Sequence, residues 1–204
     1  MKKIFISPII KKNKYLETEF SYGNNWNNFF KKDITLFTFF SLHNEIINNF
    51  ISNCDGVIIQ GSGDISKVKK NKINLLRDNF EKIIIKKAIK ENIPLLCVCR
   101  GFQLINNYFK GKLIKSRNFN HVKTNHLVTL KSNKFFKKKK IYTNSYHNYK
   151  IIKLAKKLNP IGTAKDNSIE IAISKNEKIL CFMFHPERNS FSQKDIKKTL
   201  DIFF

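Results

Sequence analysis

Residues 93–111 read IPLLCVCRGFQLINNYFKG, an apolar run followed by an amphipathic stretch, and this combination recurs along the chain. The apolar first half is typical of a buried strand, and the second half has the spacing of a helix that begins near Phe102. Cys99-Arg100-Gly101 would then form a strand-to-helix turn, which projects its first side chain above the sheet, at the positive end of a helix. This setting favours a thiolate, so Cys99 is a candidate nucleophile. The alternative is that Cys99 is a small buried core residue.

The same turn supplies a candidate donor for an oxyanion hole. The backbone N–H that follows a nucleophile at such a turn points to the place where the oxygen of a tetrahedral intermediate develops. In this chain that N–H belongs to Arg100.

Elsewhere, short apolar runs alternate with amphipathic stretches. Residues 74–91 place apolar side chains at helical spacing, with the charged residues on the other face. Alternating strands and helices predict a parallel sheet covered on both faces, with functional residues at the carboxyl ends of strands. No linker or repeat interrupts the sequence, so we expect residues 1–204 to form a single domain. The predicted strands are 3–6, 34–37, 56–59 and 94–98, strand-like segments lie within 131–145, 168–175 and 178–187, and the last predicted helix is 192–204.

A second strand end carries an imidazole and a carboxylate. The apolar run 180–184 is followed directly by His185-Pro186-Glu187, so both groups emerge at the carboxyl end of a strand. A cysteine hydrolase needs an imidazole within hydrogen-bond reach of its thiol, and a carboxylate that holds the imidazole in the right tautomer. His185 and Glu187 match these two roles, and Pro186 restricts the backbone between them.

These motifs together resemble a known family. CRGFQ at residues 99–103, combined with HPE at residues 185–187, resembles the class I glutamine amidotransferase-like proteins, specifically the γ-glutamyl hydrolases of peptidase family C26. DGVIIQGSGD at residues 55–64 and RDNFE at residues 77–81 are similar to the family's oxyanion loop and its next helix. The resemblance covers nearly the whole chain. It implies a flavodoxin-like three-layer α/β sandwich with a mostly parallel central sheet.

The resemblance also implies roles for individual residues. Cys99, His185 and Glu187 would form a Cys-His-Glu triad that works without a cofactor. Two positions depart from the family pattern, because Cys97 and Ser62 stand where the family usually has glycine. By resemblance, the oxyanion hole would be formed by the backbone at Gly61, Ser62 and Arg100, and the glutamyl moiety would be held by Gln103, Asn144, Ser145, Tyr146 and His147.

Within this family, three short strings are most similar to the γ-glutamyl-CDP-amidate hydrolases of capsule phosphoramidate biosynthesis. They are NHVKTNH at residues 120–126, NSYHNY at 144–149 and HPER at 185–188. Such an enzyme releases glutamate and cytidine diphosphoramidate from a nucleotide-linked substrate. The chain has 39 basic and 15 acidic residues, a formal net charge of +24, and basic groups near a pocket would bind a diphosphate. Arg100 and Arg188 are candidate contacts.

The composition sets further expectations about partners and location. Lys, Ile, Asn and Phe are all abundant and all have A/T-rich codons, so we do not expect nucleic acid to be the main partner. The four cysteines lack the spacing of a disulfide scaffold or zinc finger, and no apolar stretch is long enough to cross a membrane, so we expect a cytoplasmic protein. A homodimer is left open. We expect no metal, with His121 and His126 bonding backbone groups and His147 bonding the substrate or its own loop.

Several functions are compatible with this sequence. The first is hydrolysis of γ-glutamyl-CDP-amidate through a glutamyl thioester on Cys99. A glutaminase that passes ammonia to a synthase partner would share the triad, and another γ-glutamyl amine, such as γ-glutamyl-aminobutyrate, could be the substrate. The non-enzymatic alternative is a basic nucleic-acid-binding protein in which the triad residues are structural.

Overall fold

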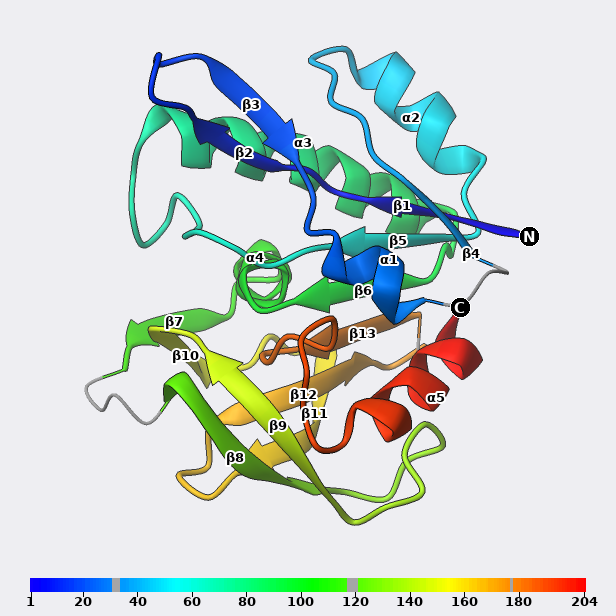
Figure 1. The fold of residues 1–204 in the computed structure, drawn as a ribbon, viewed down its shortest axis with the longest axis vertical. Coiled ribbons are helices and arrows are strands. Elements are labelled where there is room, and N and C mark those ends of the chain that lie inside the picture. Colours follow the sequence, from blue (N-terminus) through cyan, green and yellow to red (C-terminus); the bar gives the residue numbers. More distant parts are fainter. Residues whose placement is uncertain (31–33, 117–120, 177) are drawn as a thin grey trace.

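The structure is a computed structural model that describes residues 1–30, 34–116, 121–176 and 178–204. Within these residues, one large sheet has nine strands (Figure 1). Half of it is parallel and half antiparallel. The parallel strands, in spatial order, are β4 (Ile34–Phe37), β1 (Lys2–Ile6), β5 (Gly56–Ile59), β6 (Leu95–Val98) and β13 (Ile179–Phe182). The antiparallel strands that continue from β13 are β12 (Ile169–Ser174), β11 (Leu158–Ala164), β8 (Val122–Leu130) and β9 (Lys140–Tyr146).

The central parallel strands are short apolar runs because both of their faces are covered. Every residue of β5 and of β6 is buried. Val57 and Ile59 pack on one side of the sheet, and Ile58 between them packs on the other. This arrangement explains why the sequence shows continuous apolar runs there and no alternation of apolar and polar residues.

Helices cover the two faces of the sheet and complete a three-layer α/β sandwich, as the sequence predicted. Buried residues of α2, α3 and α4 share one core cluster with Val57 and Ile59, and buried residues of α1 and α5 share the other with Ile58. The side chain of Asn71 accepts a hydrogen bond from the Asn74 N–H and caps α3. The helices are α1 (Asn25–Phe29), α2 (Asn44–Ser52), α3 (Lys72–Lys90), α4 (Arg100–Tyr108) and α5 (Gln193–Phe203).

Two small antiparallel sheets of two strands each flank the large one. β2 (Ile9–Lys12) pairs with β3 (Thr18–Ser21), and β7 (Lys112–Lys115) pairs with β10 (Tyr149–Lys153). The β7–β10 pair lies beside the antiparallel half of the sheet in Figure 1.

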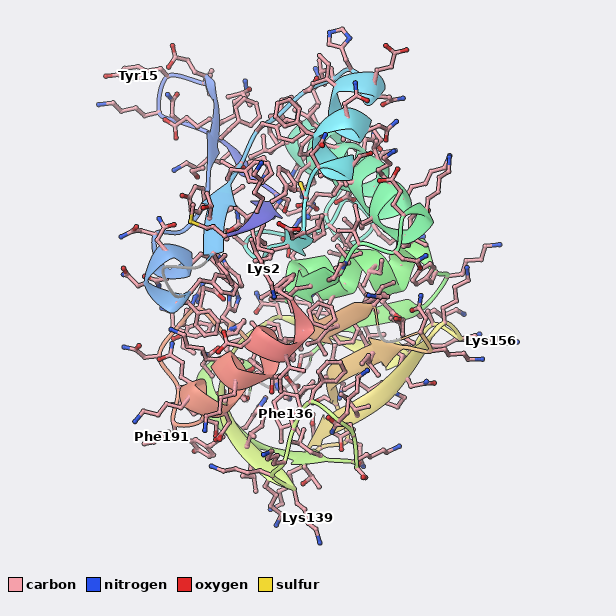
Figure 2. All side chains as sticks on the ribbon, turned by 90° about the vertical axis from the view of Figure 1, so that its right-hand side faces the viewer. Lys2, Tyr15, Phe136, Lys139, Lys156 and Phe191 are labelled. Atoms are coloured by element: carbon pink, nitrogen blue, oxygen red, sulfur yellow. The ribbon has the colours of Figure 1, made fainter. Side chains whose placement is uncertain are left out.

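The positive charge is spread over the molecule. Lys139, just before β9, and Lys156, just after β10, lie at separate edges in Figure 2, and both are exposed. No helix in the described ranges is long and apolar enough to span a membrane.

Candidate active site

Cys99 occupies a sharp turn between β6 and α4. Its backbone has φ 48° and ψ −101°, a conformation that residues other than glycine seldom adopt. The Cys99 N–H donates to the Phe182 carbonyl at 2.7 Å, and the Cys99 carbonyl accepts from the Gln103 N–H at 3.0 Å. The helix begins at Arg100, two residues before the predicted start, so the Arg100 N–H is one of the first-turn groups with no intrahelical acceptor.

Gly101 allows α4 to lie directly against β5. A Cβ atom at this position would be 2.1 Å from the backbone carbonyl oxygen of Ile59, far inside van der Waals contact. The close approach brings the loop that follows β5 beside the nucleophile turn.

The Gln60–Ser62 loop is held in place by one buried arginine. Arg77 of α3 donates to the carbonyl oxygens of Gln60, Gly61 and Ser62 at 2.9, 3.1 and 2.7 Å. In a trans peptide the N–H points opposite to the carbonyl, so the N–H groups of Gly61 and Ser62 are directed away from Arg77. A Cβ on Gly61 would be 2.5 Å from Cε1 of His185, so this loop lies against the imidazole. Of the predicted oxyanion donors, Gly61 thus lies directly beside His185, and Ser62 follows it in the loop.

His185 and Glu187 form a close pair after β13. Their Nδ1 and Oε1 atoms are 2.7 Å apart, and the His185 side chain is 4% exposed. Burial lowers the pKa of His185, but the charge and hydrogen bond of Cys99, followed by those of Glu187, raise it to about 9. The structure therefore shows the imidazole–carboxylate pair directly, and the shift in the pKa of His185 indicates that Cys99 lies near the imidazole.

Asn144 positions the imidazole, which corrects its predicted role as a glutamyl contact. Its Oδ1 accepts from the His185 N–H at 2.9 Å, and its Nδ2 donates to the His185 carbonyl at 2.8 Å. The amide also lies 3.4 Å from the Arg188 carbonyl, and the residue is buried. Its hydrogen-bonding groups are therefore used within the protein.

The rest of the predicted glutamyl-binding segment divides between two places, because neighbouring residues of a strand face opposite sides. Tyr146 lies edge-on to His185 with ring centroids 5.9 Å apart, and it is partly exposed. Ser145 and His147 point elsewhere: Ser145 donates to the His121 carbonyl at 2.9 Å, and His147 is buried beside Glu170. We therefore keep Tyr146 as the candidate substrate contact of this segment. Asn120, which begins one of the strings quoted above, lies outside the described residues.

Gln103 is also placed differently from the expectation. The residue is 3% exposed, and its Nε2 lies 4.0 Å from the sulfur of Met183. The amide thus packs inside the protein, which does not support a direct contact with the glutamyl moiety.

The Arg100 side chain is buried in a charged network, so the expectation that it binds a diphosphate is wrong. The guanidinium is 1% exposed and forms ion pairs with Asp78 and Glu81. Glu81 also pairs with Arg77 at 2.8 Å. Burial, followed by the charge of Arg100, lowers the pKa of Arg77 to about 10, so Arg77 remains charged at neutral pH. The helical pattern predicted that the charges of this helix lie on its solvent face, which is wrong for Arg77 and Glu81. Their i,i+4 spacing was the sequence feature that could have indicated an ion pair.

Cys97 faces away from the nucleophile. It pairs in register with Cys181 of β13 and packs in the core cluster under α3 and α4, whereas Cys99 belongs to the opposite cluster. Burial, followed by the neighbouring Cys181, raises the pKa of the Cys97 thiol well above its ordinary value. Cys97, which stands where the family usually has glycine, is therefore a buried core thiol that remains protonated.

An open pocket adjoins the catalytic pair. It has a volume of about 650 Å³ and meets the site at Glu187 and Arg188; Cys99 does not line it. The Arg188 guanidinium lies over the Tyr146 ring at 4.4 Å. The opposite walls come from α1 and α5, with Asn25, Asn28, Lys194 and Lys197.

Comparisons with known proteins identify the family of the chain. The sequence pattern of the family described as Peptidase C26 matches residues 31–187. The chain is 34% identical over 184 residues to the γ-glutamyl-CDP-amidate hydrolase of Campylobacter jejuni, covering 89% of this chain and 88% of the relative. It is 29% identical to the putative glutamine amidotransferase-like protein YvdE of Lactococcus lactis, covering 78% of this chain and 77% of that protein.

Solved structures share the fold at low sequence identity. A glutamine amidotransferase from Thermotoga maritima superposes with a TM-score of 0.68 at 14% identity, covering 99% of this chain and 82% of the other. A putative GMP synthase component from Thermoplasma acidophilum gives a TM-score of 0.72 at 17% identity, covering 99% of this chain and 94% of that one. With the sequence match over most of its length, the chain belongs to the peptidase C26 family of glutamine amidotransferase-like hydrolases.

Proposed function

We propose that this protein hydrolyses the γ-glutamyl amide bond of γ-glutamyl-CDP-amidate, releasing glutamate and cytidine diphosphoramidate for capsule phosphoramidate biosynthesis. The observation that carries the proposal is the pairing of His185 Nδ1 with Glu187 Oε1 at 2.7 Å, with Cys99 near enough to raise the pKa of the same imidazole. This is the constellation of a nucleophile, its base and the orienting carboxylate.

The proposed reaction proceeds through a thioester. His185 takes the proton of Cys99, and the thiolate attacks the γ-carbonyl carbon. The oxygen of the tetrahedral intermediate accepts hydrogen bonds from N–H groups of the 60–62 loop and of Arg100. The C–N bond breaks as His185 returns its proton to the leaving nitrogen. Water, deprotonated by the same imidazole, then hydrolyses the glutamyl thioester and regenerates Cys99.

The pocket beside Glu187 supports a nucleotide-linked leaving group. Its volume of about 650 Å³ falls within the range of about 300–1,000 Å³ that small-molecule sites occupy. Arg188, Lys194 and Lys197 supply positive charge to it, and Arg and Lys side chains are the usual partners of phosphate oxygens. The relative from Campylobacter jejuni is named for this substrate.

The direct test is glutamate release from γ-glutamyl-CDP-amidate, with glutamine and γ-glutamyl-aminobutyrate assayed in parallel. We expect rapid release from the nucleotide substrate and a loss of more than about 10,000-fold in kcat for Cys99→Ala. Cys54→Ala, which removes another buried thiol, is the matched control and should retain activity. Turnover of glutamine alone, increased by a synthase partner, would contradict the proposal in favour of an ammonia-delivering amidotransferase.

The pocket assignment has its own prediction. The double variant Lys194→Gln/Lys197→Gln should raise KM for γ-glutamyl-CDP-amidate about tenfold or more, because two phosphate partners are lost, and leave KM for γ-glutamyl-aminobutyrate unchanged. Lys198→Gln is the matched control, since Lys198 is on the same helix but lines a different part of the surface. If the double variant raised KM equally for both substrates, the nucleotide would not bind in this pocket.

A further inference from the structure

A buried cluster of two histidines and a carboxylate lies in the antiparallel half of the sheet, apart from the triad. Glu170 near the start of β12 is fully buried, with His147 Nε2 at 3.5 Å and His121 Nδ1 at 3.8 Å from its Oε1. Within the described ranges, one ligand atom from each residue lies within 4.8 Å of the others. This is compatible with one small cation, since two atoms each about 2.1 Å from a tetrahedral ion are about 3.4 Å apart.

In His147 and His121, the ring nitrogen that faces away from Glu170 is hydrogen-bonded to an acceptor and so carries the hydrogen. The nitrogen that faces Glu170 is left with a lone pair. His147 Nδ1 is 3.1 Å from the Tyr149 carbonyl oxygen, which only accepts, so Nδ1 carries the hydrogen. His121 Nε2 is 3.1 Å from a carboxylate oxygen of Asp166, with the same consequence. A histidine whose second nitrogen donates to a carboxylate or a backbone carbonyl is the usual arrangement around a bound metal.

Three inner atoms of the cluster lack a hydrogen-bond partner, although Glu170 Oε1 accepts from Ser168 Oγ at 3.0 Å and Ser145 Oγ lies 3.5 Å from His121 Nδ1. Nε2 of His147, Nε2 of His126 and Oε2 of Glu170 are buried without a hydrogen-bond partner in the part of the chain that the structure describes. His126 Nε2 is 3.4 Å from Glu170 Oε2, on the second oxygen of the carboxylate. His147 Nε2, whose other nitrogen carries the hydrogen, faces Glu170 Oε1 at 3.5 Å, and two buried lone pairs at such a distance are favourable only with a cation between them.

The geometry points to a divalent metal site, in which His121 Nδ1, His147 Nε2 and Glu170 bind Zn²⁺ and His126 is a neighbouring donor. Two imidazoles and one carboxylate form a donor set that suits zinc. The ion would neutralise the buried Glu170 and tie together the ends of β8, β9 and β12. No metal was expected from the sequence, because no Asp, Glu or Cys cluster joins the histidines at ligand spacing; the sheet brings Glu170 beside them.

The test measures zinc binding in the full chain without a histidine tag. Cys99→Ala serves as the background, since a thiol near an imidazole can itself bind zinc and its removal makes the result independent of the proposed catalysis. Calorimetric titration with Zn²⁺ should give one equivalent per chain. Glu170→Gln and His147→Gln should each weaken binding by at least about 100-fold, and Asp166→Asn by about 10- to 100-fold. His43→Gln, which removes an exposed histidine on the N-terminal side of α2, should have no effect.

Thermal unfolding with and without Zn²⁺ gives a second readout. The Cys99→Ala protein should unfold at a higher temperature with zinc, and the Glu170→Gln variant should not respond. Asp166→Asn decides the matter should Glu170→Gln fail to fold, because Asp166 is partly exposed. Absence of zinc binding in the Cys99→Ala protein, or binding equal in the Asp166→Asn and His43→Gln proteins, would overturn the site and leave a proton as the cation of the cluster.

Discussion

The pKa of His185 depends on its neighbours Cys99 and Glu187. Cys99 and Glu187 outweigh the effect of burial and raise its pKa from 6.5 to about 9. The folded protein therefore binds more protons than the unfolded chain between these pH values. The stabilisation from this group is fully present below pH 6.5 and is lost as the pH rises through 9.

This leads to a prediction for the titration of His185. In Cys99→Ala, we expect the pKa of His185 to fall toward its ordinary value of 6.5, since the first of its stabilising partners is lost. NMR detection of the His185 ring across pH 5 to 10 measures the change. An unchanged pKa near 9 in Cys99→Ala would mean that the thiol and the imidazole are not in contact.

Single residues also show where the sequence was insufficient. Residue types and their places after predicted strands selected Cys99, His185 and Glu187 from the sequence, and the structure pairs the last two. The contacts of residues 144–147 were harder to predict, because these four neighbouring residues point into different surroundings. Asn144 bonds the His185 backbone, whereas Ser145 bonds the His121 carbonyl on the other side. The register of β9 separates them, and register is not visible in an isolated string.

At the scale of elements, the contact between β5 and α4 sets the position of the nucleophile. We predict that Gly101→Ala lowers the free energy of unfolding by about 2–3 kcal/mol, because its Cβ would meet the Ile59 carbonyl oxygen at 2.1 Å and force the helix outward. Urea unfolding measures the loss. Gly23→Ala is the control, since a Cβ there would meet nothing within 4 Å and should change stability little. Equal stabilities of the two variants would refute this account of the packing.

Helix α3 shows what hydrophobic spacing leaves out. Its existence and length followed from the apolar positions, and the structure has it at Lys72–Lys90. The pattern could not reveal that Arg77, Asp78 and Glu81 are buried, because charged residues on a helix normally indicate a solvated face. They are compatible with burial only because Arg100, from another helix, completes a network of two positive and two negative groups.

For the whole molecule, the strands of the parallel half were predictable, whereas in the antiparallel half β12 and most of β9 were indicated and β8 and β11 were not. Strands buried on both faces, such as Gly56–Ile59, are continuous apolar runs that stand out in a sequence. In contrast, β8 alternates between exposed and partly buried residues along most of its length and contains Lys, Thr, Asn and His. Its pairing with β9 and β11 depends on partners distant along the chain, which local patterns do not identify.

The buried arginines have a consequence for how such a fold can change. The hydrogen bonds of Arg77 and Arg100 described above all end within residues 60–81, on the face of the sheet that α3 and α4 cover. The pocket beside Glu187 is walled by α1 and α5, on the opposite face. The Arg77–Arg100 network that holds the Cys99 turn and the 60–62 loop thus lies apart from the pocket walls, whereas Glu187 belongs both to the pair with His185 and to the pocket. Substitutions in α1 or α5 can therefore change the shape of the pocket without touching the buried arginines that hold the Cys99 turn and its neighbouring loop.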